Sequence, residues 1–248
     1  MKKVLMSLAA VAAVFAGCQK PELEVAPVEV MDSFTATVEN FDATKTAMDG
    51  NHVVWSSGDQ LAIFQGAGVA DLYELANGYE GLASGAFTLK AGMGDDFYGG
   101  MEMTDPRNVA FYPYAEGLAA YSEDEAWVVS KVTLPATQVY AENSFANGAF
   151  AMVAVTESLE DHVLRFKNVL GAVKLQFKGS SVVKSVALKG NNNEVLAGAA
   201  TVFAHDGFDT PSVVIAEDGA AEVGPDCGGG GPVSNEGSNF VFALPPVK

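Results

Sequence analysis

Short apolar runs separated by turn residues constrain the fold of this chain most strongly. Phe34-Thr35-Ala36-Thr37-Val38 alternates apolar residues with threonine, and many similar runs are bounded by Gly, Pro, Asn or acidic residues. Such runs are typical of strands and hairpins, and we see no long helical pattern after the first residues. The sequence therefore predicts an all-β chain of antiparallel β-sandwiches. We expect strands at 34–38, 53–55, 61–64, 87–89, 109–112, 127–129, 131–134, 164–166, 172–177, 183–188, 213–215 and 240–244.

A charged stretch at residues 157–162 divides the strand-rich body into two parts. We expect an N-terminal β-sandwich domain at 34–160 and a C-terminal β-sandwich domain at 161–248. The second part is short for a complete sandwich, and it stops at Pro-Pro-Val-Lys without a further turn. This predicts a truncated second domain with an edge of unpaired backbone groups, which is either an aggregation hazard or a docking site.

The first residues have the pattern of a lipoprotein signal peptide. Two lysines precede an apolar run, and the run ends in Phe-Ala-Gly17-Cys18. The run is shorter than the roughly 20 apolar residues that a membrane-spanning helix needs. We expect residues 1–17 to be removed between Gly17 and Cys18 and Cys18 to be lipidated. The alternative is an ordinary signal peptide with a chance cysteine. Residues 18–33 contain two prolines and read as a tether.

The charge of the chain excludes one class of partner. The formal net charge is −17, with 14 Lys+Arg and 31 Asp+Glu. Removal of residues 1–17 takes away two lysines, so the mature charge is 12 − 31 = −19. A field of that sign repels phosphates, and nucleic acid is therefore not an expected partner.

The chain has few residues suited to metal or nucleophilic chemistry. Cys18 and Cys227 are its only cysteines, so lipidation of the first leaves no internal disulfide. The Gly-rich segment 225–232 around Cys227 is most simply a flexible loop. The histidines His52, His162 and His205 are widely separated and lack zinc-ligand spacing. We expect no metal, no cofactor and no nucleotide- or nucleophile-dependent catalysis.

Two further groups of residues have both a functional and a structural interpretation. The carboxylate clusters at 95–96, 122–125 and 157–161 have the oxygen density of a glycosidase pair or a calcium site, but charge is also expected in turns. The aromatic residues Trp55, Phe111, Tyr112 and Tyr114 would stack on sugar rings if exposed, whereas in strands such residues more often fill the core. We favour solvated turns for the carboxylate clusters and core positions for the aromatic residues. We expect no enzymatic activity.

Several phrases, taken in order, resemble the fimbrillin-like lipoproteins of the Bacteroides group. They lie at 44–46, 53–64, 111–114, 134–140, 152–154, 164–175, 183–191 and 196–198. The resemblance implies two transthyretin-like β-sandwich domains, the second incomplete in this chain, and a subunit or accessory protein of type V pili. It also implies a lipid anchor in the outer membrane, exposure on the cell surface or in pili, and partners that are other pilus subunits bound by strand exchange. Family members usually continue past such a Pro-Pro segment.

The resemblance also implies proteolytic processing after a basic residue. Two candidates are Lys20 in the tether and Lys45, followed by Thr46. A cut between Lys45 and Thr46 would release the strand at 34–38 and open a groove for an incoming strand. The alternative for Lys45 is a turn lysine without this role. Asp32-Ser33-Phe34 resembles an acceptor for O-linked glycans, or is a polar turn.

The leading hypothesis is thus a non-enzymatic pilus subunit or adhesin that assembles by strand donation. The alternative is a surface glycan-binding lipoprotein that does not polymerise and binds host or bacterial glycans on exposed aromatics. An enzyme with paired carboxylates such as Asp95, Glu123 or Asp124 ranks last.

Overall fold

The computed structural model describes residues 31–39, 53–66, 68–92, 107–123, 126–142, 144–205 and 210–246. Within these ranges every regular element is a strand, which confirms the all-β prediction. No helix in these ranges has the length and hydropathy needed to span a bilayer.

The strands follow one another along the chain as follows. The first nine are β1 (Ser33–Val38), β2 (Gln60–Gln65), β3 (Gly68–Val69), β4 (Asp71–Leu75), β5 (Ser84–Ala91), β6 (Asn108–Tyr112), β7 (Ala119–Glu123), β8 (Ala126–Leu134) and β9 (Thr137–Val139). The others are β10 (Met152–Val155), β11 (Val163–Asn168), β12 (Gly171–Phe177), β13 (Val182–Ser185), β14 (Leu188–Lys189), β15 (Gly198–Ala204), β16 (Ser212–Ile215), β17 (Glu222–Pro232) and β18 (Ser238–Leu244).

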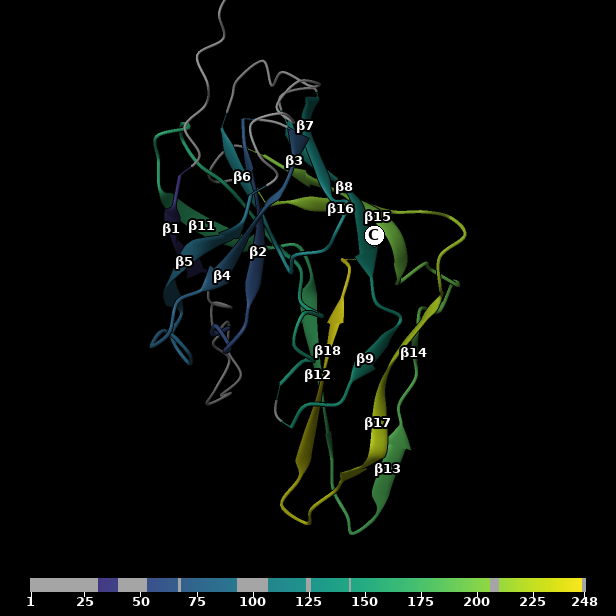
Figure 1. Cartoon of the computed structure of the whole chain (residues 1–248). Helices are drawn as coiled ribbons and strands as arrows, with labels where there is room; N and C mark the ends of the chain where they lie inside the picture. The colour runs from purple at the N-terminus through teal and green to yellow at the C-terminus, as the bar shows by residue number, and fades with distance from the viewer. Residues whose placement is uncertain are drawn as a thin grey trace, which may run out of the picture.

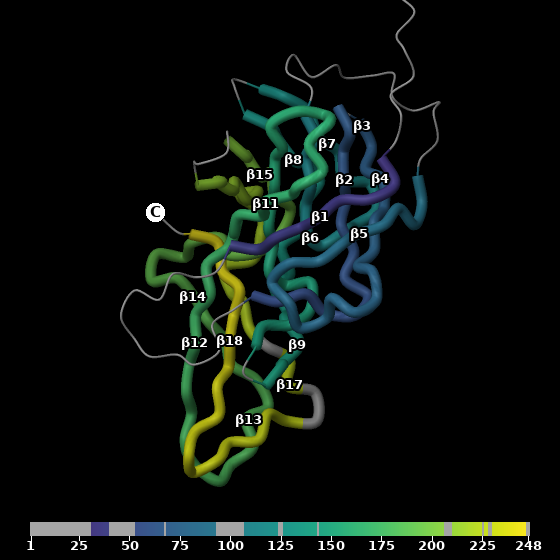
Figure 2. The backbone as a smooth tube through the Cα atoms, turned by 90° about the vertical axis from the view of Figure 1, so that its left-hand side faces the viewer, coloured from purple at the N-terminus to yellow at the C-terminus, as the bar shows by residue number. Residues whose placement is uncertain are grey.

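Seven of these strands close into a barrel where we expected an antiparallel β-sandwich. Their order is β1-β11-β10-β6-β2-β4-β5, with β5 returning to β1. The pair β1–β11 is parallel, and the other neighbours in the barrel are antiparallel. Closure gives each barrel strand a partner on both sides and leaves no open edge. In Figure 2, β1 crosses the near face of the barrel between β11 and β5.

A five-stranded sheet of order β16-β15-β8-β7-β3 shares a core with the barrel. Trp127 and Val129 from β8 and Val202 from β15 lie in the same buried cluster as the barrel residues Phe64 and Phe87. This sheet and the barrel both draw strands from either side of residue 160, since β11, β15 and β16 follow it in the sequence. The predicted boundary at residue 160 therefore does not separate the sheets.

Two further layers extend below the barrel (Figure 1). One is the ribbon β12–β18, and the other contains β13, β17 and β14, with β9 parallel to β17. Between them lies a small separate core of Cys227, Phe240 and Phe242, with half-buried apolar residues around it. The described residues thus form one large core in the barrel region and two smaller clusters, this one and one of Leu196, Ala197 and Val223.

The prediction of a loop around Cys227 is wrong, because residues 222–232 form β17. The glycines of β17 allow neighbouring segments to pack closely against the strand. A Cβ on Gly231 would lie 2.8 Å from the ring of Phe240, and a Cβ on Gly224 would lie 2.0 Å from the carbonyl oxygen of Val186. These distances exclude a larger side chain, so the glycines mark a close approach and not a mobile loop. Residues 53–55 are not a strand, although Trp55 bonds through its backbone to residues 81 and 82.

Candidate functional site

The position of β1 in the barrel, which we call the β1 slot, is the candidate site. Phe34, Ala36 and Val38 face inward and are 1%, 0% and 7% exposed. Ser33 and Thr35 lie on the outer side and are exposed. The alternation seen in the sequence is thus the pattern of a strand with one buried face.

The slot is bounded by β5 on one side and β11 on the other. Phe34 pairs with Phe87 and Ala36 with Gly85 on β5, while Val38 pairs with Phe166 on β11. These strands bond to the backbone of β1 along both edges. Without β1, both neighbours would become open edges that expose unpaired backbone groups and an apolar channel.

Trp55 forms the floor of the slot at its centre. Its indole packs edge-on against Phe87 at 4.8 Å and against Phe166 at 5.7 Å between ring centroids. It also lies below Gly85, where an added Cβ would be 3.2 Å from Trp55 Cδ1 and 2.6 Å from Leu75 Cδ1. Ala36 is the cross-strand partner of Gly85 and is 0% exposed, so a larger side chain at position 36 would have to displace buried neighbours.

A buried polar cluster holds the backbone just before β1. The Met31 amide donates to Gln65 Oε1 at 2.9 Å, and the Tyr73 hydroxyl donates to the Met31 carbonyl. Gln65 Nε2 in turn donates to Asp71 Oδ2 at 3.1 Å and to the Tyr73 hydroxyl at 3.0 Å. Gln65, Asp71 and Tyr73 are 2%, 2% and 0% exposed. Gln65 and Tyr73 thus bind both polar groups of one backbone residue, and Asp71 accepts from Gln65; we call these three side chains the peptide clamp.

The turn before β11 closes the slot from the other side. The His162 carbonyl accepts a hydrogen bond from the Thr35 amide at 2.8 Å, and its ring lies 5.8 Å from that of Phe34. Asn108, which is fully buried, donates through Nδ2 to the carbonyls of Leu159 and Asp161 at 2.9 and 3.1 Å. The charged stretch at 157–162 is therefore tied to the barrel through Asn108.

A second candidate is the ribbon β12–β18, whose described strands pair only with each other. At one residue of β18, the side chain of Gln138 on β9 makes the two backbone hydrogen bonds that a neighbouring strand would make. Its Nε2 donates to the Ala243 carbonyl at 2.7 Å, and its Oε1 accepts from the Ala243 amide at 3.0 Å. Val173 on β12 and Val182 on β13 are 38% and 60% exposed. The two lower layers thus have a sheet edge on β12–β18 and an exposed apolar residue on each of β12 and β13.

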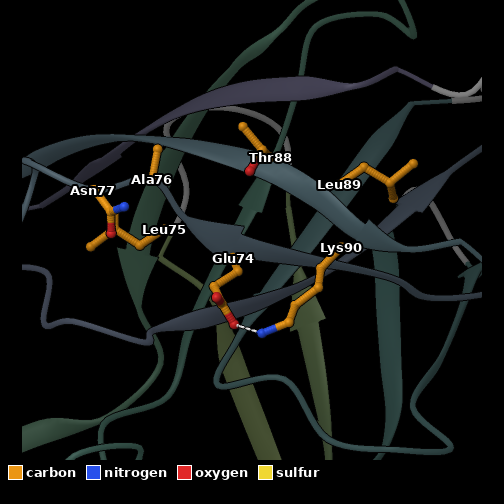
Figure 3. A pocket seen from close by; sticks show the side chains of 7 residues that line it. All are labelled: Glu74, Leu75, Ala76, Asn77, Thr88, Leu89 and Lys90. Atoms are coloured by element: carbon orange, nitrogen blue, oxygen red, sulfur yellow. Dashed lines mark hydrogen bonds and ion pairs between the residues drawn. The ribbon is translucent and has the colours of Figure 1, made fainter.

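Several described carboxylates lie in turns or in ion pairs, such as Glu222 with Lys189 at 2.8 Å. Asp161 caps its own turn, where Oδ1 accepts from the Val163 amide at 2.9 Å. A pocket opens over β4 and β5, and Figure 3 shows Glu74 and Lys90 pointing toward one another across it. Lys90 lowers the pKa of the Glu74 carboxyl by hydrogen bonding to it. In the described ranges no three His, Cys, Asp or Glu side chains gather as metal ligands would.

Asp59 is a buried carboxylate whose pKa is raised. Burial raises the pKa of the Asp59 carboxyl, although hydrogen bonds from the Ser56 amide and the Tyr112 hydroxyl lower it. Raised carboxyl pKa values are also found in catalytic acids. Here the two bonds, at 2.7 and 2.9 Å, occupy both carboxylate oxygens and hold the turn before β2 in place. We therefore assign Asp59 a structural role.

The aromatic residues considered for sugar binding lie mainly in the core, as predicted. Trp55, Phe111 and Tyr112 are 1%, 2% and 6% exposed, and Tyr114 is half-buried. They therefore do not form an exposed aromatic platform. Cys227 is buried as well, and this burial raises the pKa of its thiol.

Several predicted positions lie outside the described residues. They are Gly17, Cys18, Lys20, Lys45, Thr46, His52, Asp95, Asp96, Asp124 and Glu125. Lipidation of Cys18 and processing at Lys45 stay predictions. Glu123 lies at the end of β7 and is exposed.

The peptide clamp and Gln138 were missed by sequence reasoning. Gln65 ends an otherwise apolar run, and Asp71 and Tyr73 share one face of an alternating strand, Asp-Leu-Tyr-Glu-Leu. A polar residue in register with a buried face is the signal that would have pointed to them. Comparison of the chain with protein-family models and with curated proteins finds no match. Function is therefore inferred from the slot and from the residues of the chain.

Proposed function

We propose that this protein is a non-enzymatic, lipid-anchored surface protein that assembles as a fimbrillin-like pilus subunit. In this proposal β1 is the strand that each subunit gives up, and a strand of another subunit takes its place. The proposal includes lipidation of Cys18 and a cut between Lys45 and Thr46.

The position of β1 is the observation that supports this function. β1 is bonded on both edges and fills an apolar slot, yet it is the first strand described and precedes Lys45 in the sequence. One cut after Lys45 would therefore separate β1 from every later barrel strand. Burial of a side chain such as Phe34 contributes roughly 1.5–3 kcal/mol, so an emptied slot has a strong tendency to take up another strand.

The same cut would also release the subunit from its lipid. Cys18 and β1 both precede Lys45, so the anchor and the strand leave together. A cut after Lys20 would separate the lipid but keep β1 in the slot. The location of the cut thus distinguishes a subunit ready for strand exchange from a protein that is only released.

At the level of domains, we propose two transthyretin-like units. The barrel and its five-stranded sheet would be the first, and the layers around Phe240 and Phe242 the second, incomplete in this chain. The large core and the smaller core support this division.

Substitution of the two basic residues tests the proposal. The full chain is expressed on cells, and sheared surface material is analysed by electrophoresis without boiling for heat-resistant oligomers. We expect oligomers from the native chain and from Lys20→Gln, and their loss in Lys45→Gln. Material from the native chain that migrates only as a monomer would overturn the proposal.

A further inference from the structure

The β1 slot has three features that distinguish one incoming strand from another. They are the peptide clamp before the strand, the aromatic pocket that Tyr73 and Phe87 form around Phe34, and the centre of the slot. At the centre, Ala36 lies beside Gly85 and Trp55. Each is formed by residues that follow Lys45 in the sequence, so each would remain after β1 had left.

The peptide clamp recognises backbone and not a side chain. Gln65 accepts from the Met31 amide, and Tyr73 donates to the Met31 carbonyl. The clamp residues are at most 2% exposed and bonded to one another through Gln65 Nε2. If no peptide group reached the clamp, buried polar groups would lose partners, which is unfavourable. A strand that ends within the slot therefore binds less well than one that extends three residues before its first aromatic residue.

The side-chain positions along the slot differ in size. Phe34 packs edge-on against Tyr73 with ring centroids 5.4 Å apart and pairs with Phe87. Two residues later, Ala36 lies beside Gly85, where Trp55 and Leu75 fill the space below. At Val38 the slot ends against Phe166. Along the slot, the pockets thus accept a large side chain at position 34, a small one at 36 and a medium one at 38. The residues between these positions point outward.

The geometry points to a specific class of partner segment, an inference that rests on the proposed function. The donor is an extended segment of another subunit that presents an aromatic residue, a small residue and a branched aliphatic residue at alternating positions. Its chain continues for three residues before the aromatic residue, so that a peptide group enters the clamp. A slip by one residue would place the outward residues in the core and leave the clamp without its peptide.

Competition with synthetic peptides tests this selection. A site for a specific protease is inserted within residues 40–52 of the full chain, the chain is cut, and capture of a labelled peptide of residues 31–39 is followed by fluorescence anisotropy. Unlabelled peptides then compete. They are the native sequence, Ala36→Leu, the outward control Thr35→Val, and an acetylated peptide of residues 33–39 that lacks Met31.

We expect Ala36→Leu to compete about tenfold or more weakly than the native peptide, because it overpacks the slot. Thr35→Val should compete within about twofold, since residue 35 is exposed. The shortened peptide should lose about tenfold, as expected for two backbone hydrogen bonds. In the protein, Tyr73→Phe should weaken the 31–39 peptide about fivefold and leave the shortened peptide unchanged. Tyr121→Phe, on β7, is the matched control.

Two results would overturn the inference, and they differ in meaning. If the native peptide is captured and Ala36→Leu and the shortened peptide compete equally well, selection by the slot is wrong while strand exchange stands. If the native peptide is not captured at all, both strand exchange and its selection are wrong. The peptide series needs no substitution in the slot, so it decides the question even if Tyr73→Phe does not fold.

Discussion

Asp59 and Tyr112 show at the residue scale how a buried polar pair supports the barrel. The Tyr112 hydroxyl lies 2.9 Å from Asp59 Oδ1 and 2.8 Å from Asn147 Oδ1. Burial and the charge of Asp59 raise the pKa of the Tyr112 phenol, so this hydroxyl keeps its proton and remains a donor. The pair therefore fixes the turn at residues 56–59 from inside the molecule.

Removal of the Tyr112 hydroxyl should destabilise the fold. Tyr112→Phe leaves a buried carboxylate oxygen of Asp59 without its donor, which costs about 1–3 kcal/mol. The free energy of unfolding in urea measures this loss. Tyr121→Phe, a half-buried tyrosine on β7, is the control and should change stability by less than about 0.5 kcal/mol. Equal effects of the two substitutions would contradict the assigned role.

The raised pKa of Asp59 predicts a pH dependence of stability with a definite sign. The folded state holds this proton more tightly than the unfolded state, whose pKa is near 3.8. The contribution of Asp59 to the free energy of unfolding therefore falls as the pH rises from that value through the folded-state pKa. The native chain is compared with Asp59→Asn, so that the difference isolates the contribution of Asp59. We expect the native chain to lose stability relative to Asp59→Asn across this window; a relative gain would contradict the assignment.

At the scale of elements, β9 connects the lower layers through one side chain. Gln138 is 4% exposed and binds both backbone groups of Ala243 on β18. It thereby protects part of a sheet edge that the described strands leave without a neighbour. This contact joins the ribbon β12–β18 to β9, together with the ring contact of Tyr140 and Phe240 at 4.6 Å.

Replacement of Gln138 should release this edge. Gln138→Leu leaves the Ala243 amide and carbonyl buried without partners, at a cost of about 1–3 kcal/mol for each group. We expect lower stability in urea and faster hydrogen exchange of the Ala243 amide. Thr137→Ala, at the exposed neighbouring position on β9, serves as the control. Unchanged exchange at Ala243 in Gln138→Leu would show that the bridge does not hold β18.

The strands that sequence reasoning found are those with strong local patterns. The runs at 34–38 and 61–64 lie within β1 and β2, because alternating or continuous apolar residues report burial directly. Neither β15 nor β17 was predicted. Both are rich in alanine or glycine, and their burial depends on strands far away in the sequence. Closure of the barrel was not predictable either, because β1 pairs with β11 some 128 positions later, as Thr35 with Val163.

The site was predictable only in part, for the same reason. The alternation in residues 34–38 and its place before Lys45 led to the idea of a removable strand. The peptide clamp brings the end of β2 and the first half of β4 to Met31, and no local sequence pattern predicts that these three segments meet. The small residue at position 36 likewise has a meaning only once Gly85 and Trp55 are placed beside it.

At the scale of the whole molecule, the large core depends on β1. Phe34, Ala36 and Val38 belong to the cluster that also contains Trp55 and Phe166. The smaller core around Phe240 and Phe242 does not include β1. Loss of β1 should therefore affect the barrel first and leave the lower layers with their own contacts.

A chain that begins at Thr46 tests this dependence. It lacks β1, so it should expose the apolar slot, form oligomers in size-exclusion chromatography and become monomeric and more stable when the peptide of residues 31–39 is added. A chain that begins at Pro21 keeps β1 and should be monomeric without peptide. A Thr46 chain that is monomeric and as stable as the Pro21 chain would show that β1 is dispensable for the fold.

The mature N-terminus of the protein in assembled surface material tests the central claim most directly. Sheared oligomers are separated from cell-bound monomer, and the N-terminal peptide of each is identified by mass spectrometry. The account predicts that the subunits in oligomers begin at Thr46 and lack β1, while the cell-bound monomer begins at lipidated Cys18. Oligomers whose subunits begin at Cys18 or Pro21 would retain β1 and would contradict assembly through the β1 slot.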